Sequence, residues 1–503
     1  MALEIIHGFH RGASSLHEPD DGPRADLPPF STEWAPWRPR SLVSDDPIDQ
    51  GRGTSAGTQL PWAHREGSAR GGPEPGASPH QGPPGGEHGA PVPGPAFDNV
   101  VLDWNQVVLG AIRHASITHP PEDAPYVSRA LAMQSTAMFD VLQAIDNHPG
   151  FLVSLDAPTG ISSEAAVSAA AHEILVELFP DYRPALDRAY ALRLEQIEDG
   201  RAEDQGVAFG TKVADAVIAA RAHDGSDELG HLGLVAGREP GEYRPTPPEY
   251  TLAIQPEWGD VTPFVLRSAD QFRPGPPPAV TSVEYAQDFK QAKALGGAES
   301  AERTPEQALS ALWWSNDENS YTRVGQWSDI ADRLLADQGR SPLESAYLLT
   351  ELNVGLADAI TACWDTKYTY DAWRPITAIR EAGRDGNPAT RADPDWTPLL
   401  PITPDHPEYV SGHSVIGGLA TKVMTGFFGP IPFSATSETL PDVVLHFDNF
   451  AQAAQSEADS RIYGGVHFAY STEAGLVMGG QVGDVVVDAF QKFHVTGGDG
   501  LLL

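Results

Sequence analysis

The sequence predicts a mainly α-helical protein, a helical bundle domain with two adjacent helix bundles. Apolar residues recur at helical spacing in long runs between residues 97 and 495, which is the pattern of amphipathic helices. Alternation with a period of two residues, the pattern of half-buried strands, is nearly absent. The chain is 41% hydrophobic and contains 11 Trp residues, so it has enough apolar side chains for a large core.

Helical periodicity predicts five helices before a long polar loop and seven after it. The helices before the loop are expected at residues 100–115, 126–145, 163–178, 184–197 and 204–222. The loop, rich in Gly and Pro, is expected at about residues 223–280. The helices after it are expected at residues 283–295, 305–314, 327–338, 341–366, 412–428, 442–455 and 472–490.

The two ends of the chain differ in composition from this domain. Residues 1–96 are rich in Gly, Pro, Ser and His, and residues 496–503 form a short Gly/Leu tail. A segment of the first kind buries too little apolar surface to offset its loss of conformational entropy. We therefore expect residues 1–96 to be disordered and the domain to occupy residues 97–495.

The chain is strongly acidic, with 33 Lys and Arg residues against 69 Asp and Glu residues and a net charge of −36. Nucleic acid and anionic membranes both bind basic surfaces, so neither is an expected partner. The overall field would repel a free anion. Any anion site must therefore be built locally from basic side chains and backbone N–H groups.

Cysteine usage and the N-terminal residues bear on the compartment. Cys363 is the only cysteine, which excludes an intrachain disulfide and a Cys-based zinc site. Residues 1–7 lack the basic and apolar regions of a secretion signal. No window approaches the ~18 uninterrupted apolar residues of a membrane helix. We expect a cytoplasmic protein without membrane spans, while export is not ruled out.

Three short segments in the last third of the chain gather basic side chains and histidines. In the first, Lys367 and Arg374 are seven residues apart, about two helical turns, so on a continuous helix both would project from one face. Pro375 disfavours helical backbone at Arg374, which is therefore expected to mark a helix end. An ammonium and a planar guanidinium together suit an oxyanion with several oxygens. The alternative is a solvated charged helix face, which flanking aromatic residues disfavour.

The second and third segments add two histidines. Ser411 is suited to cap the helix that follows, and Gly412 lets the backbone approach a ligand, with His413 next in the chain. N–H groups at that helix start would face an anion. Arg461 and His467 flank a pair of glycines before another predicted helix. The second segment alone fits a capped helix with an incidental histidine, and a lone histidine in the third would more often be structural. The occurrence of all three segments in order favours a shared oxyanion site.

The pattern Lys-x6-Arg-Pro, Ser-Gly-His and Ser-Arg-x5-His resembles the signature of the vanadium-dependent haloperoxidases and of the related type-2 phosphatidic-acid phosphatases and bacterial acid phosphatases. Residues 313–327 are similar to a Trp- and Asp-containing stretch of the haloperoxidases, and residues 99–146 to the first helices of their bacterial members. The resemblance covers about residues 97–495. The chain departs from the family at Val410, where the family usually has Pro.

The resemblance implies a vanadate cofactor and a role for each residue of the motif. His467 would bond vanadium axially, and His413 would be the acid–base histidine beside the apical oxygen. Lys367 would hydrogen-bond the hydrogen peroxide that the cofactor binds and make it more electrophilic. The equatorial oxygens would be bound by Lys367, Arg374, Arg461, Ser411 and the N–H of Gly412.

Three supporting residues follow from the same resemblance. Asp317 matches a family acid that orients the arginines of the site. Trp364 matches an aromatic residue near the halide site of fungal chloroperoxidases. His406 falls where algal bromoperoxidases carry histidine and fungal chloroperoxidases carry phenylalanine, which favours bromide or iodide over chloride.

The implied activity is oxidation of a halide by hydrogen peroxide to a hypohalous acid equivalent, which reacts with an organic acceptor. The resemblance is also compatible with a homo-oligomer. The alternative is a soluble acid phosphatase, in which His467 would become a phosphohistidine. Chain length, Trp364 and the stretch at residues 313–327 favour the haloperoxidase. A helical binding protein with a decayed site is the least favoured, because both histidines and the three cations are present.

Overall fold

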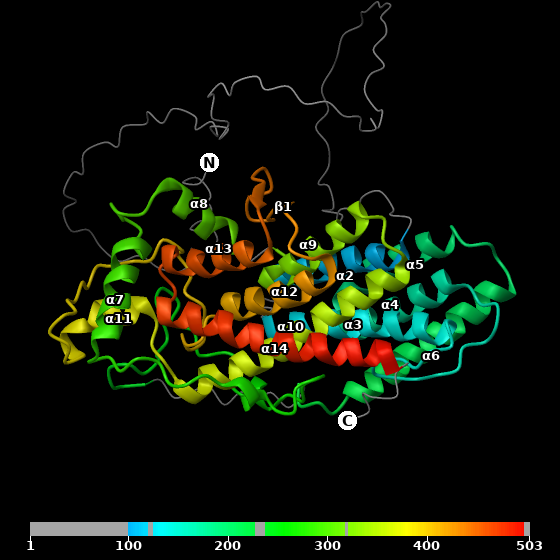
Figure 1. The fold of residues 1–503 in the computed structure, drawn as a ribbon, viewed down its shortest axis with the longest axis horizontal. Helices are drawn as coiled ribbons and strands as arrows, with labels where there is room; N and C mark the ends of the chain where they lie inside the picture. Colours follow the sequence, from blue (N-terminus) through cyan, green and yellow to red (C-terminus); the bar gives the residue numbers. More distant parts are fainter. Residues whose placement is uncertain (1–98, 119–123, 227–236, 317–319, 497–503) are drawn as a thin grey trace, which may run out of the picture. The chain divides into compact units, whose positions relative to one another are not determined.

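The structure, a computed structural model, describes residues 99–118, 124–226, 237–316 and 320–496. These residues form thirteen α-helices, four short 3-10 helices and one β-hairpin, so the predicted mainly α fold is confirmed (Figure 1). The segment at residues 1–96 that is predicted to be disordered, and the tail beyond residue 496, lie outside the described residues.

An N-terminal group of helices comprises α2 (Val100–Thr118), α3 (Ala124–Ile145), α4 (Ser163–Leu178), α5 (Arg183–Leu194) and α6 (Arg201–Arg221). Helix α4 packs against both α3 and α6. Ser162 caps α4, because its side chain accepts the N–H of Ala165. A Cβ at Gly210 of α6 would lie 2.0 Å from the carbonyl oxygen of Ala166. Only glycine permits this close packing of α6 on α4.

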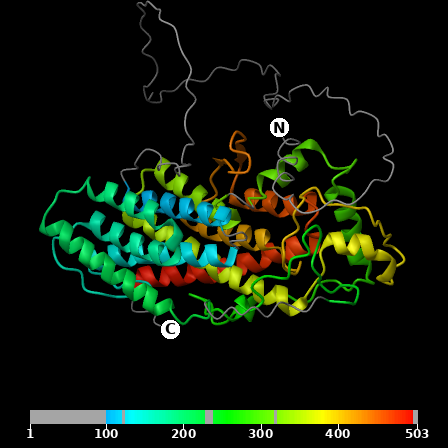
Figure 2. The same cartoon turned by 180° about the vertical axis from the view of Figure 1, so that it is seen from behind.

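A C-terminal group comprises α10 (Pro342–Tyr370), α12 (Gly412–Phe428), α13 (Phe450–Tyr463) and α14 (Ala469–Thr496). Helix α12 packs along α14 and also contacts α13 and α10. Helix α10 packs against α3 as well, so it is shared between the two groups, and the view from behind shows the long helices running alongside one another (Figure 2). Ser341 and Glu344 form a capping box at the start of α10.

Shorter elements connect the groups and cover their ends. The helices are α7 (Val283–Gly296), α8 (Pro305–Trp313), α9 (Thr322–Asp337) and α11 (Pro375–Glu381). The 3-10 helices are η2 (Pro180–Tyr182), η3 (Trp258–Asp260), η4 (Ala269–Phe272) and η5 (Ala382–Arg384). Strands β1 (Phe433–Ala435) and β2 (Leu445–Phe447) pair antiparallel, with Phe433 opposite Phe447.

Two predicted helices, at residues 163–178 and 412–428, have the observed bounds of α4 and α12. The prediction of a helix at residues 442–455 is wrong at its start, because strand β2 lies there and α13 begins at Phe450. Asn449 explains the later start, since its side chain accepts the N–H of Gln452 and caps α13. The seven-residue α11 is not predicted, because so short a helix carries little periodicity.

In each group of helices, a buried carboxyl on one helix accepts hydrogen bonds from three consecutive backbone N–H groups of a loop. Asp140 of α3 accepts the N–H groups of residues 151–153 at 2.5, 3.1 and 2.9 Å. Asp358 of α10 accepts those of residues 264–266 at 2.6, 2.7 and 2.8 Å. Burial raises the pKa of Asp140 to about 7 and that of Asp358 to about 6, against the lowering effect of these hydrogen bonds. The two groups thus share a local structure that is not visible as a sequence repeat.

The ends of several helices in the C-terminal group carry the residues that the sequence singled out. Lys367 lies in the last turn of α10 and Arg461 in the last turn of α13. Ser411 caps α12, and His467 lies two residues before α14. None of the described helices has the length and apolar character needed to cross a membrane.

Candidate functional site

The basic residues of the predicted site are almost completely buried. The exposed fraction is 0% for Lys367 and Arg374, 1% for Arg461 and His467, and 3% for His413. Burying a charged side chain is costly unless hydrogen bonds or an opposite charge compensate it. The partners of these side chains therefore indicate what the site is built to hold.

Lys367 reaches from α10 to the loop that precedes α12. Its Nζ donates to the carbonyl oxygen of Pro407 at 2.9 Å and to that of Glu408 at 3.1 Å. Burial lowers the pKa of Lys367, and the positive charge of Arg374 lowers it further. An anion bound beside Lys367 would oppose both effects and stabilise the ammonium form.

Arg374 lies beyond the end of α10 rather than on it. Helix α10 ends at Tyr370, and Asp371 follows in the left-handed region, with φ 47°. Arg374 is extended, with φ −80° and ψ 155°, directly before α11. The effect expected of Pro375 is confirmed. Lys367 and Arg374 do not share one continuous helix face, because the chain turns between them.

Four hydrogen bonds hold the Arg374 guanidinium. Its Nε and Nη2 donate to the carbonyl oxygen and the Nδ1 of His406, each at 3.0 Å. Its Nη1 donates to the carbonyl oxygen of Val466 at 3.0 Å and to the Nε2 of His467 at 3.1 Å. These acceptors are carbonyl oxygens and imidazole nitrogens, so they satisfy N–H groups without supplying a negative charge.

His467 lies between α13 and α14 with both ring nitrogens engaged. Its Nε2 accepts from Arg374, and its Nδ1 lies 2.8 Å from Oε1 of Glu408. Burial lowers the pKa of His467 well below its ordinary value, and the charges of Arg374 and Lys367 lower it further. The imidazole is therefore neutral at physiological pH, the form in which a histidine can donate a lone pair to a ligand.

The start of α12 combines a cap with open space. The Oγ of Ser411 accepts the N–H of Ser414 at 3.4 Å. Gly412 is the first helical residue, so its N–H has no intrahelical acceptor. Although Gly412 is buried, a Cβ there would meet nothing closer than the Sγ of Cys363 at 4.0 Å. A ligand could therefore approach the backbone at this position.

His413 and Arg461 belong to the same charged environment. The Nε2 of His413 donates to the carbonyl oxygen of Trp314 at 3.1 Å, a contact from the Trp-containing stretch noted in the sequence. Burial lowers the pKa of His413 well below its ordinary value, and the charges of Arg461 and Arg323 add to this effect. Because Arg461 also lowers the pKa of His467, it acts on both histidines.

Of the three supporting residues, two lie beside the basic cluster. Trp364 and His406 are in ring contact, with centroids 5.0 Å apart and planes at 46°. His406 also accepts from Arg374, so this aromatic pair adjoins the guanidinium. Asp317 lies outside the described residues.

Sequence reasoning missed two charged residues that act on the site. Glu408 is 0% exposed and contacts His467 through its side chain. Arg323, at the start of α9, is among the charges that lower the pKa of His413. A signal existed for Glu408, since a carboxylate stands three residues before Ser411 in a segment expected to approach the ligand. We find no sequence signal for Arg323.

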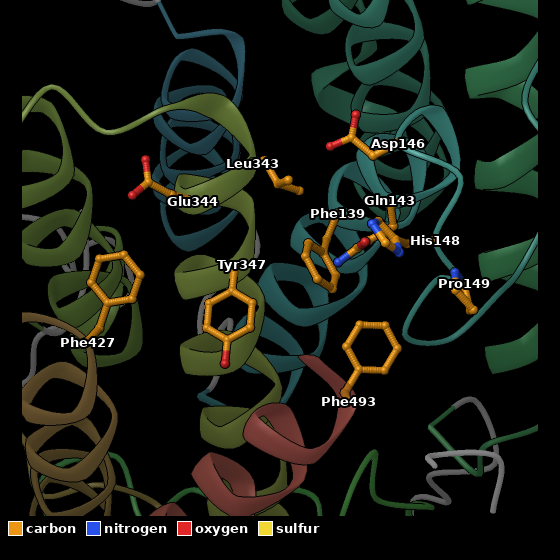
Figure 3. Close-up of a pocket in the computed structure, with 10 residues that line it drawn as sticks. All are labelled: Phe139, Gln143, Asp146, His148, Pro149, Leu343, Glu344, Tyr347, Phe427 and Phe493. Atoms are coloured by element: carbon orange, nitrogen blue, oxygen red, sulfur yellow. The ribbon is translucent and has the colours of Figure 1, made fainter. Parts of the chain in front are cut away.

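One cavity among the described residues lies away from these side chains. It measures about 430 Å³, and four of its ten lining residues are Phe or Tyr (Figure 3). The lining residues are Phe139, Gln143, Asp146, His148, Pro149, Leu343, Glu344, Tyr347, Phe427 and Phe493. Tyr347 precedes Lys367 by twenty residues on α10, about 30 Å along the helix, so the cavity cannot serve the basic cluster directly.

The fold and the site together define a class of protein. It is an α-helical protein in which buried Lys and Arg side chains, a neutral histidine and a helix start face one region, an arrangement suited to a multiply charged oxyanion. Residues 347–496 match the family model described as the second helical-bundle domain of VCPO. This part of the chain therefore resembles the second helical-bundle domain of a vanadium haloperoxidase family.

Individual vanadium haloperoxidases resemble the chain over most of its length. The vanadium chloroperoxidase of Curvularia inaequalis is 24% identical over 511 residues, covering 76% of this chain and 82% of that protein. A bacterial vanadium-dependent iodoperoxidase superposes with a TM-score of 0.68 at 28% identity, covering 78% of this chain and 96% of its own. The holo form of a bacterial vanadium-dependent chloroperoxidase shares the fold, with a TM-score of 0.63 at 18% identity and coverage of 79% and 98%.

Proposed function

We propose that this protein is a vanadium-dependent haloperoxidase, an oxidoreductase that uses hydrogen peroxide to oxidise a halide to a hypohalous acid equivalent. The observation that carries the proposal is the contact between Arg374 and His467. A buried guanidinium, bonded to carbonyl oxygens and imidazoles, lies against the Nε2 of a neutral imidazole. A ligand for a metal oxyanion and a counter-charge for that oxyanion thus adjoin in one buried site.

The residues present fit vanadate. His467 would supply the one direct protein ligand, through Nε2. A Cβ at buried Gly412 would have 4.0 Å to its nearest neighbour, so the space beside this backbone has room for the oxygen atoms of a ligand. The oxyanion would be held by Lys367, Arg374, Arg461, Ser411 and the N–H of Gly412. When bound, vanadate supplies a Lewis-acidic centre that activates hydrogen peroxide toward a halide.

The side chains of the chain have separate tasks in this proposal. Lys367, held at 2.9 and 3.1 Å by two carbonyl oxygens, presents its ammonium in a fixed place and stabilises negative charge on the reacting oxygens. His413 has a pKa lowered by burial, so it is in its base form at neutral pH and would take a proton from the peroxide. Burial of the whole cluster excludes water and strengthens these interactions.

The finer part of the proposal concerns the halide. Bromide or iodide would be favoured over chloride, because the resemblance to the family matches His406 to the histidine of the bromoperoxidases. The contact of His406 with Trp364 puts a polar ring beside the indole. The Nε1 of Trp364 is buried and has no acceptor among the described residues, so it could donate to an anion. An organic acceptor would consume the oxidised halogen.

A single assay tests the proposal against the acid phosphatase alternative. The purified chain, freed of vanadate, is given hydrogen peroxide, bromide and a dye, with and without added vanadate. Bromination that depends on vanadate is expected. Hydrolysis of a phosphomonoester without vanadate, inhibited when vanadate is added, would instead identify a phosphatase in which His467 attacks phosphorus.

A further inference from the structure

Glu408 is a buried carboxyl that the proposed chemistry does not use. It lies in the loop before α12, and its Oε1 accepts the N–H of Phe468 at 3.0 Å and lies 2.8 Å from the Nδ1 of His467. Its own carbonyl oxygen accepts from Lys367 at 3.1 Å and from the Oγ of Ser471 at 3.3 Å. One residue of this loop therefore touches both the ammonium and the imidazole of the site.

These contacts determine which ring nitrogen of His467 carries the proton. A guanidinium is a donor only, so the Nε2 that faces Arg374 at 3.1 Å must accept and must be unprotonated. In a neutral imidazole the proton is then on Nδ1, which donates it to Oε1 of Glu408. In the reverse arrangement, a protonated Glu408 would donate to Nδ1 and the ring proton of His467 would be on Nε2. Two N–H donors, Nε2 of His467 and Nη1 of Arg374, would then face each other.

We infer that Glu408 is a positioning residue that holds His467 as its Nδ1–H tautomer, with the Nε2 lone pair directed to the oxyanion. A carboxylate behind a ligating histidine fixes the tautomer and ring orientation and makes the other nitrogen a better ligand. The identity of the oxyanion rests on the proposed function. The tautomer of His467 and its hydrogen bond to Glu408 do not rest on the proposed function, because they are properties of the protein without its cofactor.

The backbone of Glu408 gives the same residue a second task. Because its carbonyl oxygen anchors Lys367, the distance between the ammonium and the Nε2 of His467 depends on the position of this one loop. The fully buried side chain cannot exchange its partner for water. Loss of the carboxylate should therefore loosen His467 specifically, while Lys367 keeps its backbone acceptors at Pro407 and residue 408.

Two variants separate hydrogen bonding from charge. In Glu408→Gln the side chain keeps its shape, and its amide oxygen can still accept from His467 and Phe468, so the tautomer should persist. In Glu408→Leu no acceptor remains. Glu351→Gln is the matched control, because Glu351 is another buried carboxyl, on α10, sixteen residues before Lys367 and about 24 Å from it along the helix.

The first measurement is the 15N–1H spectrum of histidine-labelled full-length chain without vanadate, with His467 assigned from His467→Gln. Wild type, Glu408→Gln and Glu351→Gln should show His467 protonated on Nδ1. Glu408→Leu should lose the protected Nδ1–H signal. Protonation of His467 on Nε2 in the wild type, or an unchanged spectrum in Glu408→Leu, would overturn the inference.

The second measurement is vanadate affinity of the same proteins by titration calorimetry, with inorganic phosphate as a second probe. Glu408→Leu should bind vanadate about 10–100-fold more weakly, and Glu408→Gln should recover part of the loss. Glu351→Gln should bind as wild type. Equal affinity in wild type and both Glu408 variants overturns the positioning role. If Glu408→Leu does not fold, the comparison is between wild type and Glu408→Gln. Weaker vanadate binding by Glu408→Gln supports the positioning role, and equal binding overturns it. A wild-type chain that binds phosphate but not vanadate contradicts the proposed function while leaving the tautomer result intact.

Discussion

The Nη1 of Arg374 lies 3.1 Å from the Nε2 of His467, and both side chains are almost completely buried. The guanidinium can only donate a hydrogen bond, and the unprotonated Nε2 can only accept one. A ligand that binds between them must therefore offer an acceptor to Arg374 and an acceptor of the lone pair to His467. A metal oxyanion can meet both at once, because its central atom accepts the nitrogen lone pair while its oxygens accept from the guanidinium.

The direct ligand is tested by His467→Ala. Removing the imidazole should weaken vanadate binding at least about 100-fold, which corresponds to about 2.7 kcal/mol. Equilibrium dialysis of the vanadate-free protein measures this affinity. His446→Ala, at an exposed histidine of strand β2, is the control and should bind as wild type. Tight vanadate retention by His467→Ala would contradict the assignment.

The geometry of the guanidinium is tested by Arg374→Lys. Lysine keeps the positive charge but cannot reach the four acceptors of Arg374 together. Hydrogen bonds of charged groups contribute about 1.5–3 kcal/mol, so a loss of vanadate affinity of about 10–100-fold is expected. Arg333→Lys, at an arginine that pairs with Asp329 on α9, should change nothing. Equal affinities of the two lysine variants would show that charge alone suffices.

The halide preference is tested by His406→Phe. The substitution removes a polar ring from its contact with Trp364 and leaves an apolar one. We expect the ratio of kcat/KM for bromide to that for chloride to fall, measured by dye halogenation at constant peroxide. Because Arg374 also loses an acceptor at Nδ1, vanadate affinity is measured in parallel and vanadate is kept saturating. Chloride oxidised by the wild type as readily as bromide would refute the role of His406.

The pH dependence of stability is tested at Glu351, where burial raises the pKa to about 8. The folded chain keeps a proton there that the unfolded chain releases. The resulting stability is complete below the ordinary pKa of 4.5, declines as pH rises, and is lost above a pH of about 8. Glu351→Gln should flatten this part of the profile, by up to a few kcal/mol at about 1.4 kcal/mol per pKa unit. Urea unfolding at several pH values measures it, and parallel profiles would contradict the raised pKa.

The sequence predicted the helical fold well where apolar spacing is long and regular, as in α4 and α12, whose bounds match the prediction. It failed where local signals compete, as at residues 442–455, where apolar residues belong to a β-strand and an Asn cap sets the helix start. Boundaries of this kind depend on a single side-chain hydrogen bond, which periodicity does not record.

The sequence by itself determined the mainly α class and brought forward Lys367, Arg374, His413, Arg461 and His467, because order and spacing within short segments are local properties. Tertiary structure alone decided how these side chains are paired. Glu408 and His467 are 59 residues apart and meet only because the loop before α12 packs against the start of α14. Contacts across such separations depend on the packing of whole helices, which no local pattern encodes. The tautomer of His467, and with it the direction of its lone pair, is therefore a property of the fold.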